Sequence, residues 1–108
     1  FAGFDEMLLP ATVLGVDGAI GSTYNVNGIR AKQIFELAKN SKIAEALEIQ
    51  HTTNDLIEGI LSNGLYQTIK EILKLEGVDA GYCRKPMKKI SQEQVEFAKE
   101  LHKKFFKN

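Results

Sequence analysis

One segment of the sequence, residues 16–22 (VDGAIGS), is typical of a buried strand, whereas the stretches after it are typical of helices. The apolar residues of this segment alternate poorly, which favours a strand that is buried on both faces, as in parallel sheets. Such a strand needs parallel neighbours, and the rest of the sequence offers none. We therefore expect the C-terminal part of a larger α/β protein. The alternative is a free-standing helical domain in which the segment is only a loop.

Proline, glycine and capping residues predict where the helices begin and end. Pro10 suits the first turn of a short helix that ends at Leu14, and Gly15 suits its C-terminal cap. A capping box formed by Ser91 and Gln94 predicts the start of the last helix. The other helices are expected from a cap at Asn25 or Asn27 to about Lys39, from Ser41 to Asn63, and over residues 65–75 before Gly77.

The long helix expected at residues 41–63 carries an apolar stripe. Gln50 and Asn54 interrupt the stripe. The residues that recur at helical spacing, and that we expect to face the core, are Ile43, Leu47, Ile57, Ile60 and Leu61.

Composition narrows the classes of function. The chain has 108 residues, 44% hydrophobic and 26% charged, which is typical of one ordinary soluble domain. Fourteen basic residues balance fourteen acidic ones, so we expect neither nucleic acid nor a membrane as a partner. No apolar run approaches the ~20 residues that cross a bilayer and no signal peptide is recognisable, which predicts a cytoplasmic protein. Cys83 is the only cysteine, and His51 and His102 lack metal-site spacing, so we expect no metal and no cofactor.

Two short motifs are candidates for a binding site. The first, GFDE at residues 3–6, offers the adjacent carboxylates of Asp5 and Glu6. The second, GVDGAIGSTYNVNG at residues 15–28, is rich in glycine, which lets the backbone approach a ligand or a neighbouring element closely. Taken alone, the carboxylates are typical of helix capping or of a solvated loop, and Ser22 is typical of a turn.

These two motifs, followed by GLYQTIKEILKLEGVDAGYCRKPM at residues 64–87, resemble the C-terminal portion of the N-acetylneuraminate lyase family, within the dihydrodipicolinate synthase superfamily. The resemblance covers essentially the whole chain. It implies a (β/α)8 TIM barrel with a C-terminal helical extension, assembled as a homotetramer. Residues 1–40 would be the end of the barrel, from the end of strand seven to helix eight, and residues 41–108 the extension. The 108 residues themselves would be mostly helical.

The resemblance also implies an activity and a site. Members of the family split N-acetylneuraminate into N-acetylmannosamine and pyruvate through a Schiff-base lysine. Asp5 and Glu6 would accept hydrogen bonds from hydroxyls of the sugar's tail, Gly3 would contribute backbone, and Ser22 would reach the same polyol, because both segments face one pocket in a barrel. The catalytic lysine and tyrosine would precede Phe1, so we expect no catalytic residue here.

Two other functions stay open at this point. One is another pyruvate-dependent class I aldolase, such as dihydrodipicolinate synthase, although two acceptor carboxylates would not favour its dicarboxylic substrate. The other is a helical interaction module without enzymatic activity.

Overall fold

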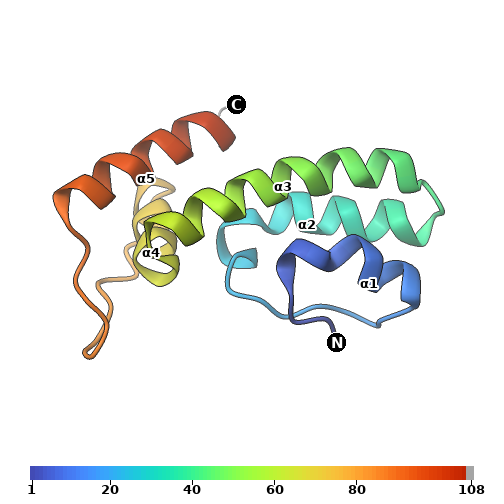
Figure 1. Cartoon of the computed structure of the whole chain (residues 1–108), viewed down its shortest axis with the longest axis horizontal. Helices are drawn as coiled ribbons and strands as arrows, with labels where there is room; N and C mark the ends of the chain where they lie inside the picture. Colours follow the sequence, from blue (N-terminus) through green and yellow to red (C-terminus); the bar gives the residue numbers. More distant parts are fainter. Residues whose placement is uncertain (107–108) are drawn as a thin grey trace. The chain divides into compact units, whose positions relative to one another are not determined.

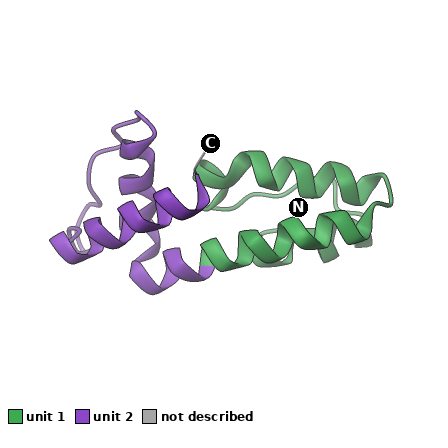
Figure 2. Ribbon diagram, turned by 90° about the horizontal axis from the view of Figure 1, so that it is seen from above, with its two compact units in different colours: residues 1–57 green, residues 58–108 purple. Residues whose placement is uncertain are grey.

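The computed structural model describes residues 1–106, and these residues are mainly helical (Figure 1). The chain divides into two compact units, Phe1–Ile57 and Glu58–Asn108, with the boundary inside a long helix (Figure 2). The elements of the described residues are the 3-10 helix η1 (Asp5–Met7) and the α-helices α1 (Leu8–Leu14), α2 (Tyr24–Lys39), α3 (Ile43–Asn63), α4 (Leu65–Leu75) and α5 (Gln92–Phe105).

Residues 16–22 do not form the predicted strand. The β pairing found in residues 1–106 is a single parallel bridge between Ala2 and Ala19. The Ala2 N–H donates to the Gly18 carbonyl and the Ile20 N–H donates to the Ala2 carbonyl, both at 2.9 Å. The prediction of a strand buried on both faces is wrong for this chain, because a single bridge cannot cover both faces. Ile20 is accordingly 68% exposed.

The first helix ends where the sequence predicted. Gly15 caps α1 with a φ of 100°, and its N–H donates to the Thr12 carbonyl at 3.0 Å. This left-handed conformation favours glycine because a Cβ atom would be strained there. The helix begins at Leu8, two residues before Pro10. The turn η1 that precedes it carries both candidate carboxylates, and we call residues 5–7 the acidic turn.

The start of α2 differs from the prediction. The helix begins at Tyr24, ahead of a cap at Asn25 or Asn27. Asn27 interrupts the helix with φ −116° and ψ 27°. Its side chain is buried, donates to the Thr53 hydroxyl at 3.2 Å and accepts from the Arg30 guanidinium at 3.1 Å. The asparagine therefore forms a bend that is held by side chains.

The buried face of α3 also differs from the prediction. The helix begins at Ile43 and not at Ser41, which lies in the preceding turn with a φ of 62°. Ile43, Leu47 and Leu61, which were expected inside, are 41%, 42% and 50% exposed. Gln50, which was expected to interrupt the apolar stripe, is 3% exposed. The buried positions of α3 are Ala46, Gln50, Thr53, Leu56, Ile57 and Ile60.

Each unit has buried apolar residues of its own. In the first unit, one cluster joins three helices: Leu8 and Leu9 of α1, Ile34 and Ala38 of α2, and Ala46 of α3. The residues 58–106 bury Ile60, Ile69, Ile72, Ala98, Leu101 and Phe105.

The predicted bounds of α4 are confirmed. The capping box of α5 is confirmed as well, because the Gln94 N–H donates to the Ser91 hydroxyl and the Ser91 N–H to the Gln94 side chain.

Two helical glycines give a matched test of this packing. A Cβ atom at Gly59 would lie 2.7 Å from Cδ2 of buried Leu101, whereas no atom lies within 4 Å of one at Gly28. Alanine favours a helix over glycine by about 1 kcal/mol, and overpacking a core costs about 1–3 kcal/mol. We predict that Gly28→Ala raises and Gly59→Ala lowers the thermal midpoint of the circular dichroism signal. An increase in both variants would contradict the close contact at Gly59.

Candidate functional site

The carboxylate of Asp5 joins the acidic turn to the glycine-rich segment. Asp5 is 7% exposed. Its Oδ2 accepts hydrogen bonds from the Thr23 backbone N–H, at 3.1 Å, and from the Thr23 hydroxyl. A Cβ atom at Gly21 would overlap the same carboxylate. Glycine is therefore required at residue 21 because a side chain from the acidic turn occupies that space.

The structure brings the segments of all four predicted site residues together. Gly3 lies beside the bridge between Ala2 and Ala19, where a Cβ atom would be 4.0 Å from the Ile20 carbonyl oxygen. Asp5 lies against residues 21–23, and Ser22 is half-buried in that segment. Glu6 is half-buried in the acidic turn, and its carboxylate makes no hydrogen bond within residues 1–106. The sequence predicted this neighbourhood, and the binding roles of the four residues stay predictions.

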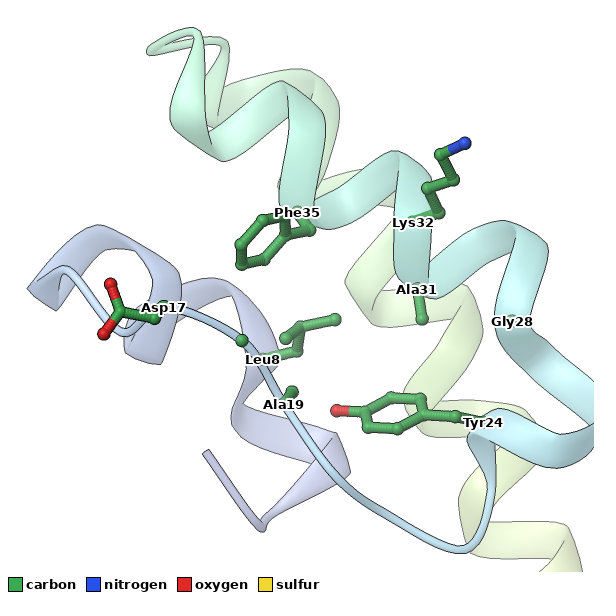
Figure 3. A pocket seen from close by; sticks show the side chains of 9 residues that line it. Leu8, Asp17, Ala19, Tyr24, Gly28, Ala31, Lys32 and Phe35 are labelled. Carbon is green, nitrogen blue, oxygen red and sulfur yellow. The ribbon is translucent and has the colours of Figure 1, made fainter. Parts of the chain in front are cut away.

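Tyr24 lies close enough to Asp5 and Glu6 for their charges to shift the pKa of its hydroxyl. Burial, followed by the negative charge and close approach of the Asp5 carboxylate and then by the charge of Glu6, raises the pKa of Tyr24 to about 12. The Tyr24 hydroxyl is buried and has no hydrogen-bond partner among the described residues. In Figure 3 the Tyr24 ring extends toward Ala19 and Leu8. The phenol is thus kept neutral beside the carboxylates.

A cavity of about 290 Å³ lies next to Tyr24, between the glycine-rich segment and α2 (Figure 3). Leu8, Ala19, Ala31 and Phe35 line it together with the Tyr24 ring. Asp17 and Lys32 also contribute to its wall. The apolar lining suits packing of apolar side chains better than it suits a sugar, which needs convergent polar groups.

Sequence reasoning missed two residues that hold the candidate site in place. Thr23 gives both of its donors to Asp5. The side chain of Gln50 accepts from the Leu9 N–H at 2.9 Å and donates to the Asp5 carbonyl at 3.4 Å. The spacing of Gln50 from Ala46 and Thr53 was a signal of burial, because these positions share one face of a helix.

Metal-binding groups and lysines elsewhere in the described residues also bear on the chemistry that the chain could support. Within residues 1–106, no group of three or more His, Cys, Asp or Glu side chains gathers to hold a metal ion. All lysines of that range are exposed except Lys70, whose amine donates to the Ala80 carbonyl at 3.0 Å. None of the described helices combines the length and the apolar character needed to span a membrane.

Residues 1–104 match the Dihydrodipicolinate synthetase family, and the chain belongs to that family. It is similar to N-acetylneuraminate lyase from Fusobacterium nucleatum, with 94% identity over 108 residues, which are 100% of this chain and 37% of that protein. The chain thus spans little more than a third of this relative's length. The resemblance predicted from the sequence is confirmed.

Solved structures agree with the sequence comparison. A crystal structure of the Fusobacterium nucleatum lyase complexed with pyruvate has a TM-score of 0.96 at 94% identity, over 99% of this chain and 36% of that one. The Clostridium difficile protein CdNal, solved in complex with mannosamine, has a TM-score of 0.97 at 71% identity, over 98% of this chain and 37% of that one. The described fold therefore corresponds to one part of a larger enzyme fold.

The pKa of Tyr24 tests the contact between the two segments. Replacing Asp5 by asparagine removes a negative charge that disfavours the phenolate, so the pKa of Tyr24 should fall below about 12 while burial keeps it above 10.0. Absorbance of tyrosinate against pH measures it, and a Tyr24→Phe variant identifies the contribution of Tyr24. Because the folded pKa is raised, the stability that Tyr24 contributes is complete below pH 10.0 and is lost as the pH rises to about 12. An unchanged Tyr24 pKa in Asp5→Asn would contradict the contact.

Proposed function

We propose that these 108 residues form the part of an N-acetylneuraminate lyase that binds the hydroxylated tail of the substrate. The observation that carries this proposal is the junction of the acidic turn with residues 21–23, in a chain 94% identical to such a lyase. The enzyme would split N-acetylneuraminate into N-acetylmannosamine and pyruvate. The acidic turn would contact the end of the sugar that is remote from the bond that breaks.

The proposed architecture places residues 1–40 at the end of a (β/α)8 barrel and residues 41–108 in a helical extension. The parallel bridge between Ala2 and Ala19, with α1 between its two partners, supports this because a strand–helix–strand unit pairs its strands in parallel. The apolar cavity beside Ala19 and the exposed Ile20 would pack against the rest of the barrel. Assembly as a homotetramer in the cytoplasm is part of the same proposal.

The two carboxylates would bind the sugar from different environments. Glu6 is the accessible acceptor, since its carboxylate is half-buried and makes no hydrogen bond within the described residues. Asp5 is committed to Thr23, and it would keep residues 21–23 beside the sugar. A charged acceptor forms a stronger hydrogen bond with a hydroxyl than a neutral one does. An acceptor that the bound substrate covers but does not bond is also costly, so such a site rejects analogues that lack the hydroxyls of the tail.

The covalent step would use a lysine from outside the described residues. A Schiff-base lysine must be neutral when it attacks, which usually requires a desolvated amine or a neighbouring cation. The lysines of the described residues are exposed, apart from Lys70 with its bond to the Ala80 carbonyl. We therefore assign the nucleophile to the remaining two thirds of a longer lyase. Two acceptor carboxylates in the site disfavour the dicarboxylic substrate of a dihydrodipicolinate synthase.

A chimaera makes the proposal testable. Here these 108 residues replace the matching segment of the Fusobacterium nucleatum lyase. Replacing Asp5 or Glu6 by alanine should lower kcat/KM for N-acetylneuraminate by roughly tenfold or more. The Glu6 variant loses a charge-assisted hydrogen bond to the tail, and the Asp5 variant loses the bonds that hold residues 21–23 beside it. Borohydride trapping of the pyruvate Schiff base should stay nearly unchanged, since pyruvate has no tail.

The control is Glu36→Ala, which removes an exposed carboxylate whose nearest cation, on Lys32, is 3.9 Å away. It should change neither cleavage nor trapping. Loss of trapping in the Asp5 or Glu6 variant would place the pair in the pyruvate half of the site and contradict the proposal.

A further inference from the structure

Gln50 of α3 bonds the backbone at the start of the acidic turn and in the first turn of α1, which follows it. Its side chain is 3% exposed. Oε1 accepts from the Leu9 N–H at 2.9 Å, and Nε2 donates to the Asp5 carbonyl at 3.4 Å and to Asn54 Oδ1 at 2.8 Å. Leu9 and Asp5 are 41 and 45 residues away in the sequence. A single side chain therefore spans the backbone that carries Glu6.

The local sequence cannot replace the bond to Leu9. The first N–H groups of a helix have no partner within the helix, and a polar side chain at the N-cap usually accepts from one of them. Met7 is the N-cap of α1 and makes no such bond. The Leu9 N–H lies in the first turn of α1 and is bonded by Gln50 instead. A buried N–H without a partner costs about 1–3 kcal/mol, so this bond fixes where α1 begins.

An amide is the side chain that this position requires. The Leu9 N–H needs an acceptor and the Asp5 carbonyl needs a donor, and a glutamine supplies both from one planar group. Asn54, one turn further along α3, accepts the other proton and so orients the amide. A carboxylate would lack the donors, and a leucine of similar size would lack both functions.

We propose that Gln50 is a positioning residue for the substrate's tail, which acts by holding the acidic turn. This inference rests on the proposed function, since it concerns the same site. The Gln50 amide fixes the Asp5 carbonyl before Glu6 and the Leu9 N–H after it. The orientation of the Glu6 carboxylate thus depends on a residue of α3 that does not itself touch the sugar.

The test uses the chimaera with Gln50→Leu, and with Gln33→Leu as the control at an exposed glutamine of α2. For N-acetylneuraminate, Gln50→Leu should raise KM about tenfold with kcat within about twofold, because binding of the tail and not the chemistry is disturbed. The pyruvate Schiff base should be trapped as in the unsubstituted chimaera. Hydrogen exchange at the Leu9 amide should become at least about tenfold faster, because its acceptor is gone. Gln33→Leu should leave all of these unchanged.

An unchanged KM, or an equal loss of trapping and cleavage, would overturn the inference. If Gln50→Leu does not fold, Gln50→Glu decides: it keeps the acceptor for Leu9 and loses the donors, so KM should rise while the Leu9 amide stays protected. An unchanged KM in that variant would also overturn the inference. An unsubstituted chimaera that traps pyruvate but does not cleave N-acetylneuraminate would contradict the proposed function, and exchange at Leu9 would then show whether Gln50 holds the turn.

Discussion

The buried carboxylate of Asp5 is the interaction on which the candidate site depends. A carboxylate removed from water is costly unless its oxygens are bonded, and Thr23 supplies two donors to it. Gly21 leaves the space that the carboxylate occupies. The acidic turn and residues 21–23 are therefore held together by one group, and a side chain at residue 21 would separate them.

Gln50 extends this arrangement to α3. It bonds the backbone of Asp5 in the acidic turn and of Leu9 in α1, so the turn is fixed from one side by residues 21–23 and from the other by α3. Asn27 and Thr53 add a second buried polar contact between α2 and α3. Buried polar groups that satisfy one another in this way specify a unique arrangement where an apolar contact would permit several. Helices α2 and α3 therefore help to hold the candidate site in place.

Features with a local physical cause were predictable from the sequence. Gly15, the bounds of α4 and the capping box at Ser91 and Gln94 depend on nearby residues, and the structure confirms them. The proximity of the acidic turn to residues 21–23 followed from the resemblance to a barrel enzyme. The prediction of a strand at residues 16–22 was wrong because strand formation depends on pairing partners, and the described residues offer this segment only the bridge to Ala2.

The errors in α2 and α3 have a common origin. Asn27 and Gln50 are polar, and sequence patterns place polar residues outside or at helix caps. Both are buried here because their hydrogen-bond partners come from distant parts of the chain. Asp5 and Glu6 likewise looked equivalent in the sequence, because the partner that distinguishes them is distant in the chain. Asp5 is bonded to Thr23, whereas Glu6 is not.

The most direct test of the proposed function is to locate the lysine that forms the Schiff base with pyruvate. The chimaera is incubated with pyruvate and borohydride, digested, and analysed by mass spectrometry, with the isolated 108 residues treated in parallel. We predict one reduced pyruvate adduct on a lysine outside these 108 residues, no adduct on the isolated chain, and no pyruvate release from N-acetylneuraminate by the isolated chain. An adduct on any lysine within residues 1–108 would contradict the division between a tail-binding segment and a nucleophile supplied elsewhere.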